Sequence, residues 1–334
     1  MVKMFVSDDG DLDLLKGKTI GVIGYGNQGA AWALNLRESG IAVVVGSIRD
    51  RSHARSVADG FDTRDVPNAV KVADIHLLLV PDEIMPELFD RDVRPNLRPG
   101  QTIVVASGYN ITYGSLKYPP DADVLMIAPR MIGTGVRASY LDGTGFPSLV
   151  AVHQDSTGEA QKRMLAVCKA MGTLKRGAFE SSCDEETLCD LFNEHFGYLY
   201  SLRRAYEMLV EAGASPEAAM LEFWASGEEM ELARVHMTHG LFHQLALHSQ
   251  TSQYGQEVTS RLIPQEERME RDRLRRIIAG IQDGTFARDW ALEQKAGFPQ
   301  WQRIHRQNLS HPMIAEEERL LRALGVLERD AEEN

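Results

Sequence analysis

The sequence predicts an α/β fold, a doubly wound and mainly parallel sheet, followed by an all-helical second half. Three observations predict it. Short apolar runs alternate with helical stretches, a glycine-rich turn follows one of the first runs, and β-branched runs become rare beyond about residue 181. We therefore expect two domains, residues 1–181 and residues 182–334.

The first element is an apolar strand, residues 18–23, which leads into Gly24-Tyr25-Gly26-Asn27-Gln28-Gly29 and then into helix formers at 30–36. A strand, a glycine turn and a helix in this order are typical of a Rossmann dinucleotide site. The glycines allow a tight turn and a close approach to pyrophosphate, which the helix N-terminus then binds. The alternative is a turn that needs glycine only for its shape.

The second strand, residues 41–45, ends at Gly46-Ser47-Ile48-Arg49-Asp50-Arg51-Ser52, where this fold reads the adenosine ribose. Arg49, Arg51 and Ser52 favour the 2'-phosphate of NADPH, because guanidinium and hydroxyl groups both bind phosphate oxygens. Asp50 favours NADH, since a carboxylate accepts from a free ribose hydroxyl. We expect NADPH, and NADH stays open.

Four further strands are expected at 75–80, 102–106, 124–128 and 149–152. Ligands of such sheets bind beyond the carboxyl ends of the strands, so the loops there form the expected rim of the active site. Pro81-Asp82-Glu83, Ser107 to Asn110 and Pro129-Arg130 lie in these loops. The two prolines also have an ordinary role as strand terminators.

In the second half, residues 185–213 are expected to form one long helix, which carries Asp190 and Glu194 four positions apart and hence on one face. Mg²⁺ would offset their mutual repulsion and the cost of burying them. The alternative is a pair of ordinary surface carboxylates. A second helix, from about Pro216, carries Glu228 and a face with His236, His239 and His243, either a transition-metal site or a polar stripe.

The amino-acid composition limits the classes of binding partner that we expect. The 334 residues include 48 acidic and 36 basic side chains, a formal charge of -12, which disfavours nucleic acid. The basic stretch 268–276 is interleaved with acidic residues and is expected to be a solvated helix face. Three cysteines without metal-ligand spacing, and no N-terminal apolar run typical of a signal peptide, favour the cytoplasm. The lack of an apolar run of ~20 residues disfavours membrane insertion.

Several motifs together resemble a short, class I ketol-acid reductoisomerase over about residues 13–324. They are the turn at 17–29, Pro81-Asp82-Glu83, Asp190-Leu191-Phe192-x-Glu194, Ser249-x-Thr251-x-x-Tyr254-Gly255 and the stretch from Gly284 to Pro312. The resemblance implies a Rossmann domain and a knotted helical domain, with an active site completed by a second subunit of a homodimer or an assembly of dimers. It also implies NADPH and one or two Mg²⁺ ions, which help an acetohydroxy acid to rearrange and be reduced in valine and isoleucine synthesis.

The resemblance assigns roles residue by residue. The predicted cofactor-binding residues are Gly24, Tyr25, Gly26, Asn27, Gln28, Gly29, Arg49, Arg51, Ser52, Val80, Pro81, Asp82, Ser107 and Gly133. The predicted catalytic residues are Asp190, Glu194, Ser249, Arg130, Glu228 and Ser107, of which Asp190, Glu194 and Glu228 are also the predicted metal ligands.

The chain departs from the family pattern at several site positions. Ser107 replaces a histidine and Arg130 replaces a lysine, so one titratable group is absent and one cation has a different shape. Met131 and Trp224 are expected to narrow the pocket, and Trp224 takes the place of a metal-site glutamate. His248 replaces an apolar residue before Ser249 and is a candidate for the missing proton transfer.

Three functions remain open. The first is a divergent reductase of a 2-keto acid or a related carbonyl or imine, in which alkyl migration is weakened or lost because that step relies most on two cations. The second is an ordinary ketol-acid reductoisomerase. The third is a catalytically silent nucleotide-binding assembly protein.

Overall fold

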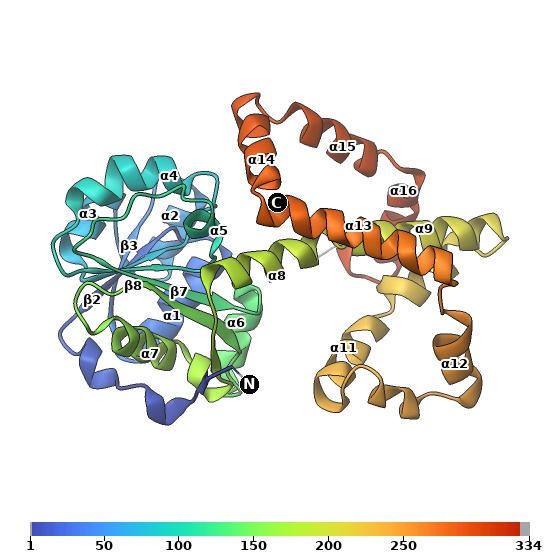
Figure 1. The fold of residues 1–334 in the computed structure, drawn as a ribbon, viewed down its shortest axis with the longest axis horizontal. Helices are drawn as coiled ribbons and strands as arrows, with labels where there is room; N and C mark the ends of the chain where they lie inside the picture. Colours follow the sequence, from blue (N-terminus) through green and yellow to red (C-terminus); the bar gives the residue numbers. More distant parts are fainter. Residues whose placement is uncertain (1, 328–334) are drawn as a thin grey trace. The chain divides into compact units, whose positions relative to one another are not determined.

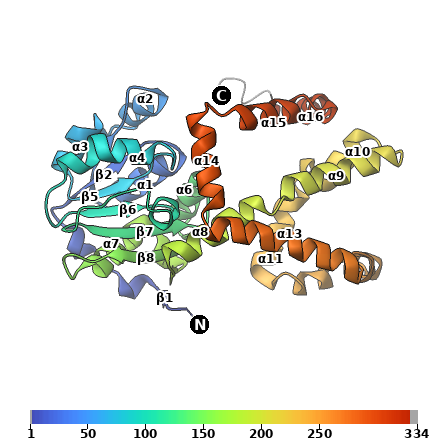
Figure 2. The same ribbon diagram turned by 45° about the horizontal axis from the view of Figure 1, so that its top comes forward.

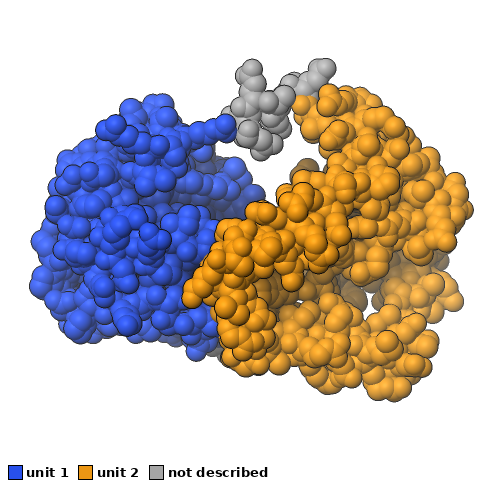
Figure 3. All heavy atoms as spheres, turned by 90° about the horizontal axis from the view of Figure 1, so that it is seen from above, with its two compact units in different colours: residues 1–191 blue, residues 192–334 orange. Residues whose placement is uncertain are grey.

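The computed structural model describes residues 2–327. They form two compact units, unit 1 up to Leu191 and unit 2 from Phe192 (Figures 1 and 3). The division falls within helix α8, Cys183–His195. The first unit is α/β and the second is helical, so the predicted fold class is confirmed.

Unit 1 contains one sheet with the strand order β1-β9-β8-β7-β6-β5-β2-β3-β4 among the described residues. The run from β4 to β7 is parallel, and β2 pairs with β3 on one side and with β5 on the other. Successive strands are added on one side of β2 up to β4 and on its other side from β5 onwards. Ligands of doubly wound sheets bind at the carboxyl ends of the strands at such a switch point. The strands are β1 Met4–Phe5, β2 Thr19–Ile23, β3 Ala42–Gly46, β4 Asp62–Arg64, β5 Ile75–Leu78, β6 Thr102–Val105, β7 Asp123–Pro129, β8 Ser148–Gln154 and β9 Ala178–Glu180.

All six predicted strands occur, within a few residues of their expected bounds. The strands that the sequence did not reveal are β1, β4 and β9, which have two or three residues each. A segment that short carries no measurable alternation of apolar and polar residues. Their pairing is decided by the neighbouring strands.

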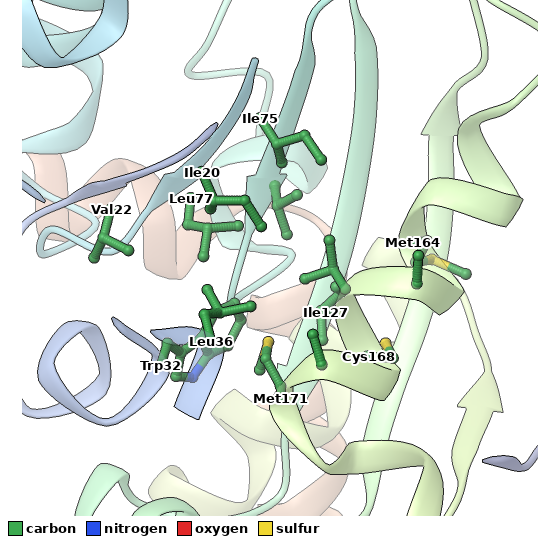
Figure 4. Packing of buried hydrophobic residues seen from close by; sticks show 14 of the residues in the cluster. Ile20, Val22, Trp32, Leu36, Ile75, Leu77, Ile127, Met164, Cys168 and Met171 are labelled. Carbon is green, nitrogen blue, oxygen red and sulfur yellow. The ribbon is translucent and has the colours of Figure 1, made fainter. Parts of the chain in front are cut away.

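Helices cover both faces of the sheet and bury two apolar clusters. Figure 2 shows α3 and α4 on one side and α7 on the other. One cluster joins α1 and α7 to the sheet around the fully buried Trp32 (Figure 4), and the other lies under α3 and α4 around Phe89. The helices of this unit are α1 Asn27–Glu38, α2 Arg51–Ala58, α3 Val66–Val72, α4 Met85–Leu88, α5 Tyr109–Thr112, α6 Gly133–Leu141 and α7 Ala160–Met171.

The helices of unit 2 are interrupted by glycines with positive φ. The single helix predicted over 185–213 is wrong, because Gly197, at φ 93°, separates α8 from α9. Gly227, at φ 87°, likewise breaks the helix predicted from Pro216. The remaining helices are α9 Tyr198–Glu211, α10 Pro216–Met220, α11 Glu228–His239, α12 Gln250–Tyr254, α13 Pro264–Gln282, α14 Thr285–Lys295, α15 Pro299–Leu309 and α16 Pro312–Ala323.

The buried core of unit 2 is small. Its described cluster consists of Tyr206, Ala219, Met220 and Leu320, with a few partly buried neighbours. The basic stretch 268–276 lies on α13, where Arg271, Arg273 and Arg275 pair with acidic residues three or four positions away. Most of its side chains are exposed, so the predicted solvated face is confirmed. No described helix is long and apolar enough to span a membrane.

Candidate functional site

The glycine turn after β2 forms an open cradle. Gly24 has φ 96°, and a Cβ on Gly29 would stand 2.0 Å from the Gly24 carbonyl oxygen, so both positions require glycine. A Cβ on Gly26 would meet open space, and α1 begins at the next residue. Exposed backbone at a helix N-terminus fits a pyrophosphate group.

A second loop is held against this turn. A Cβ on Gly133 would lie 2.2 Å from the Asn27 carbonyl oxygen, and the Gln28 side chain donates to the Met131 carbonyl at 2.9 Å. Trp32 in turn donates to Gln28 at 3.1 Å. The structure therefore brings Gly133 to the glycine turn, as a shared cofactor role requires.

The Tyr25 side chain points into the core. Its hydroxyl donates to Asp59 at 2.7 Å, and its ring packs against Phe61. Burial and the hydrogen bond to Asp59 raise the pKa of Tyr25 far above its usual range. Any contact of Tyr25 with the cofactor therefore comes from its backbone.

The ribose end lies after β3. Asp50 accepts from the backbone amide of His53 at 3.0 Å and from the Ser52 hydroxyl at 2.6 Å, and these hydrogen bonds lower the pKa of Asp50. Its carboxylate thereby caps α2. Arg49 and Arg51 are exposed on either side of it.

Arg130 connects two carboxylates at the carboxyl end of β7. Its Nη2 donates to Glu186 Oε1 at 2.6 Å, and its Nη1 donates to Asp190 Oδ1 at 3.0 Å. Glu186 and Asp190 are one turn apart on α8, so one planar guanidinium fork reaches both. The structure thus joins the predicted residues Arg130 and Asp190.

Glu186 belongs to this cluster of charged side chains and was not among the predicted site residues. Its side chain is fully buried, and its second oxygen accepts from the Gly108 backbone amide at 2.7 Å. Burial raises its pKa, against the opposing effects of Gly108 and Arg130. The signal was available, because Glu186 precedes Asp190 by four positions just as Asp190 precedes Glu194.

Ser107 and Asp82 lie in the loops after β6 and β5. The Ser107 hydroxyl accepts from the Tyr109 backbone amide at 3.2 Å, and Asn110 donates to the Asp82 carboxylate at 2.9 Å. Burial raises the pKa of Asp82 to about 6, helped by the negative charges of Glu83 and Glu186. Val80 is half-buried and Pro81 is exposed beside them.

Met131 and Trp224, which were predicted to narrow or reshape the pocket, each contact apolar neighbours within their own unit. Met131 packs against the core of unit 1 and accepts from the Ser139 hydroxyl at 3.4 Å. Trp224 packs beside Tyr206 in unit 2 and donates to Glu317 at 2.8 Å. Both side chains are partly buried among these neighbours.

The other predicted residues belong to unit 2. Glu194 is near the end of α8, Glu228 opens α11 in an exposed position, and Ser249 caps α12 by accepting from the Ser252 amide at 3.3 Å. The shared histidine face is wrong for His243, because α11 ends at His239 and Gly240 follows with φ 92°. His248 contacts Gln244 at 2.8 Å.

Asp190 and Glu194 fit a hard cation in their donor chemistry, because both offer carboxylate oxygens one helical turn apart. Within residues 2–327, however, no three His, Cys, Asp or Glu side chains gather as a group able to hold a metal ion. The pair therefore fits as part of a metal site that needs further oxygen ligands.

Comparisons with known proteins agree with this arrangement. Residues 14–177 match the domain family described as acetohydroxy acid isomeroreductase, NADPH-binding domain, and residues 183–325 match the ketol-acid reductoisomerase C-terminal domain. The chain belongs to the ketol-acid reductoisomerase family. Members of this family are NAD(P)H-dependent oxidoreductases that use Mg²⁺.

The chain is similar to family members over nearly its whole length. It is 40% identical to the "putative ketol-acid reductoisomerase 3" of Saccharolobus solfataricus, over 95% of this chain and 96% of the other. It is 36% identical to the NADP(+) ketol-acid reductoisomerase of Caldivirga maquilingensis, over 93% and 95%. The solved structure of an NADH-preferring ketol-acid reductoisomerase from an uncultured archaeon is 32% identical, with a TM-score of 0.87 over 95% and 99% of the two chains.

Proposed function

We propose that this ketol-acid reductoisomerase relative reduces a 2-keto acid, or a related carbonyl or imine, and that its alkyl-migration step is weakened or lost. The observation that carries the proposal is the Arg130 fork on Glu186 and Asp190. The Arg130 guanidinium already neutralises part of the carboxylate charge that would otherwise bind metal ions. Alkyl migration depends on those metal ions. Reduction makes a smaller demand, because the cofactor delivers the hydride to the carbonyl carbon and the alkoxide left on the carbonyl oxygen then needs only a proton.

In this reaction the glycine turn holds the cofactor pyrophosphate through the backbone of Gly26 and the N-terminus of α1. Asp190, Glu194 and Glu228 would hold Mg²⁺, which supplies Lewis-acid polarisation of the substrate carbonyl when bound. Ser249 would contact the substrate carboxylate. Ser107 cannot titrate near neutral pH, whereas the Asp82 carboxyl, with its pKa raised to about 6, can donate a proton.

The test compares two substrates under the same conditions. NADPH oxidation is followed with 2-acetolactate, which must rearrange first, and with the already rearranged 3-hydroxy-2-keto acid, each across a range of Mg²⁺ concentrations. We expect turnover of the rearranged acid to exceed that of acetolactate by at least about tenfold, equivalent to ~1.4 kcal/mol in the barrier. Equal turnover would contradict the loss of alkyl migration.

The second candidate is an ordinary ketol-acid reductoisomerase of valine and isoleucine synthesis. Its support is the 40% identity to a putative ketol-acid reductoisomerase over nearly the full chain. In that case acetolactate is the best substrate of any panel tested. Tight cofactor binding without turnover of any carbonyl or imine would instead support the catalytically silent assembly protein.

For the cofactor we propose a preference for NADPH. Asp50 is engaged in capping α2 and accepts from the Ser52 hydroxyl, while Arg49 and Arg51 are exposed beside it. The relatives differ in this respect, since the name of one specifies NADP(+) and that of another specifies a preference for NADH. Replacing Arg49 and Arg51 together with glutamine should raise the KM for NADPH about tenfold or more and change the KM for NADH little.

We propose that the chain forms a homodimer, or an assembly of dimers, with each active site completed across subunits. The domains would be residues 1–181 and 182–334, the second serving both metal binding and dimerisation. Support comes from the small core of unit 2 and from its large exposed apolar side chains, among them Phe242 and Met237, 72% and 71% exposed. Sedimentation velocity with and without cofactor measures the assembly.

A further inference from the structure

Arg130 holds its two carboxylates in unequal ways. The Glu186 side chain is fully buried, and both of its oxygens have donors, Arg130 and the Gly108 amide. The Asp190 side chain is 44% exposed, and Arg130 reaches only its Oδ1. Separating a buried carboxylate from its cation has a large free-energy cost, because no water replaces the lost interaction. An exposed carboxylate can be hydrated instead, so the cost is small.

Arg130 is therefore held firmly by Glu186, whereas its contact with Asp190 can open. Release of Asp190 leaves Arg130 on Glu186, with no buried charge uncompensated. If Arg130 released Glu186, a fully buried carboxylate would be left without a counter-ion. Arginine is suited to this asymmetry because its two terminal nitrogens can serve separate carboxylates, which a single ammonium nitrogen does less well.

We propose that Arg130 is a built-in counter-ion that competes with the divalent cation for Asp190, so that metal binding requires the Arg130–Asp190 contact to open while Arg130 stays on Glu186. A cation so close to a metal ligand lowers the affinity for the metal in two ways. It occupies a carboxylate oxygen, and it repels a second positive charge. The inference rests on the proposed use of Asp190 as a metal ligand and is independent of the substrate.

The experiment measures metal affinity without substrate. Full-length protein with bound NADPH is titrated with MgCl₂ in a calorimeter at fixed ionic strength, and Mn²⁺ binding is followed by electron paramagnetic resonance. Arg130→Lys keeps a positive charge for the buried Glu186 and loses the reach to Asp190. We expect this variant to bind Mg²⁺ more tightly by about tenfold, and Arg130→Gln to show the same sign.

A matched control is Arg163→Lys. Arg163 donates to the fully buried Asp123 at 3.0 Å, and Asp123 begins the same strand, β7, that Arg130 follows. This control should leave Mg²⁺ affinity unchanged, and Asp190→Asn should weaken binding in every background. Far-UV circular dichroism confirms the fold of each variant. The double variant Arg130→Gln/Glu186→Gln, which removes the buried carboxylate charge together with the cation, decides if Arg130→Lys does not fold.

Unchanged or weaker Mg²⁺ binding by the Arg130 variants would overturn the inference, because Arg130 would then position Asp190 for the metal instead of competing with it. The proposed function can fail separately. If acetolactate proves the best substrate while Arg130→Lys still binds Mg²⁺ more tightly, the substrate proposal falls and the competition stands.

Discussion

The two units of this protein bury their apolar residues to very different extents. Unit 1 buries two large clusters against its sheet, including the fully buried Trp32 and Phe89. Unit 2 buries a four-residue cluster and leaves Phe242, Met230 and Leu199 more than two-thirds exposed. An apolar surface of this extent is typical of an interaction site. The comparison supports the proposed homodimer, in which unit 2 forms the interface.

The largest expected effect concerns the core of unit 1. Trp32→Ala should lower the free energy of unfolding by about 3–5 kcal/mol, because it removes a fully buried side chain and its hydrogen bond to Gln28. Trp301, 53% exposed in unit 2, is the matched control, and its replacement by alanine should cost less than about 0.5 kcal/mol in the single chain. Urea unfolding measures both. A large, concentration-dependent cost at Trp301 would place it in a subunit interface.

The second prediction tests the dependence of unit 2 on a partner. Phe242→Asp should dissociate the assembly and reduce activity about a hundredfold, since a charge in an apolar interface costs at least ~3 kcal/mol. Leu141→Asp, at 64% exposure in unit 1, provides the control and should leave mass and activity unchanged. Light scattering and turnover are measured together. An assembly that survives the Phe242 change would show that this surface does not form the interface.

The third prediction concerns Asp82, whose pKa is raised to about 6 from a usual value of 3.8. Because the folded state prefers the protonated carboxyl, folding stability falls as pH rises from about 4 through about 6 and is then constant. Asp82→Asn should stabilise metal-free, cofactor-free protein at pH 7 by about 1–2 kcal/mol and change nothing below about pH 4. Thermal unfolding across this range gives the measurement, and an unaltered pH profile would refute the assignment.

The smallest effects separate folding from binding at the glycine turn. The methyl group of Gly26→Ala meets open space in the protein, so the free energy of unfolding should change by less than about 0.5 kcal/mol. The same methyl group enters the cofactor cradle and should weaken NADPH binding about tenfold. Gly133→Ala places a Cβ 2.2 Å from the Asn27 carbonyl and should lower stability as well as affinity. Fluorescence titration and urea unfolding together distinguish the two. Identical profiles would mean that the cradle does not lie at Gly26.

The sequence by itself determined the elements with strong local signals. The glycine turn at Gly24 to Gly29 and the six longer strands follow from turn chemistry and apolar periodicity, which are properties of neighbouring residues. Motifs spread along the chain also identified the family, which the comparisons confirmed. The positions of the helix breaks at Gly197 and Gly227 were not predicted, because an isolated glycine is also tolerated inside a helix.

Only the tertiary structure decided which side chains meet. Arg130 and Glu186 are 56 positions apart in sequence, and the fully buried carboxylate that fixes the arginine could not be inferred from either residue alone. Met131 and Trp224 were expected to narrow or reshape the pocket, and the fold supplies each with apolar neighbours in its own unit that the sequence does not reveal. Local pattern sets strands, turns and helices, whereas charge pairing and burial depend on distances that exist only once the sheet has formed.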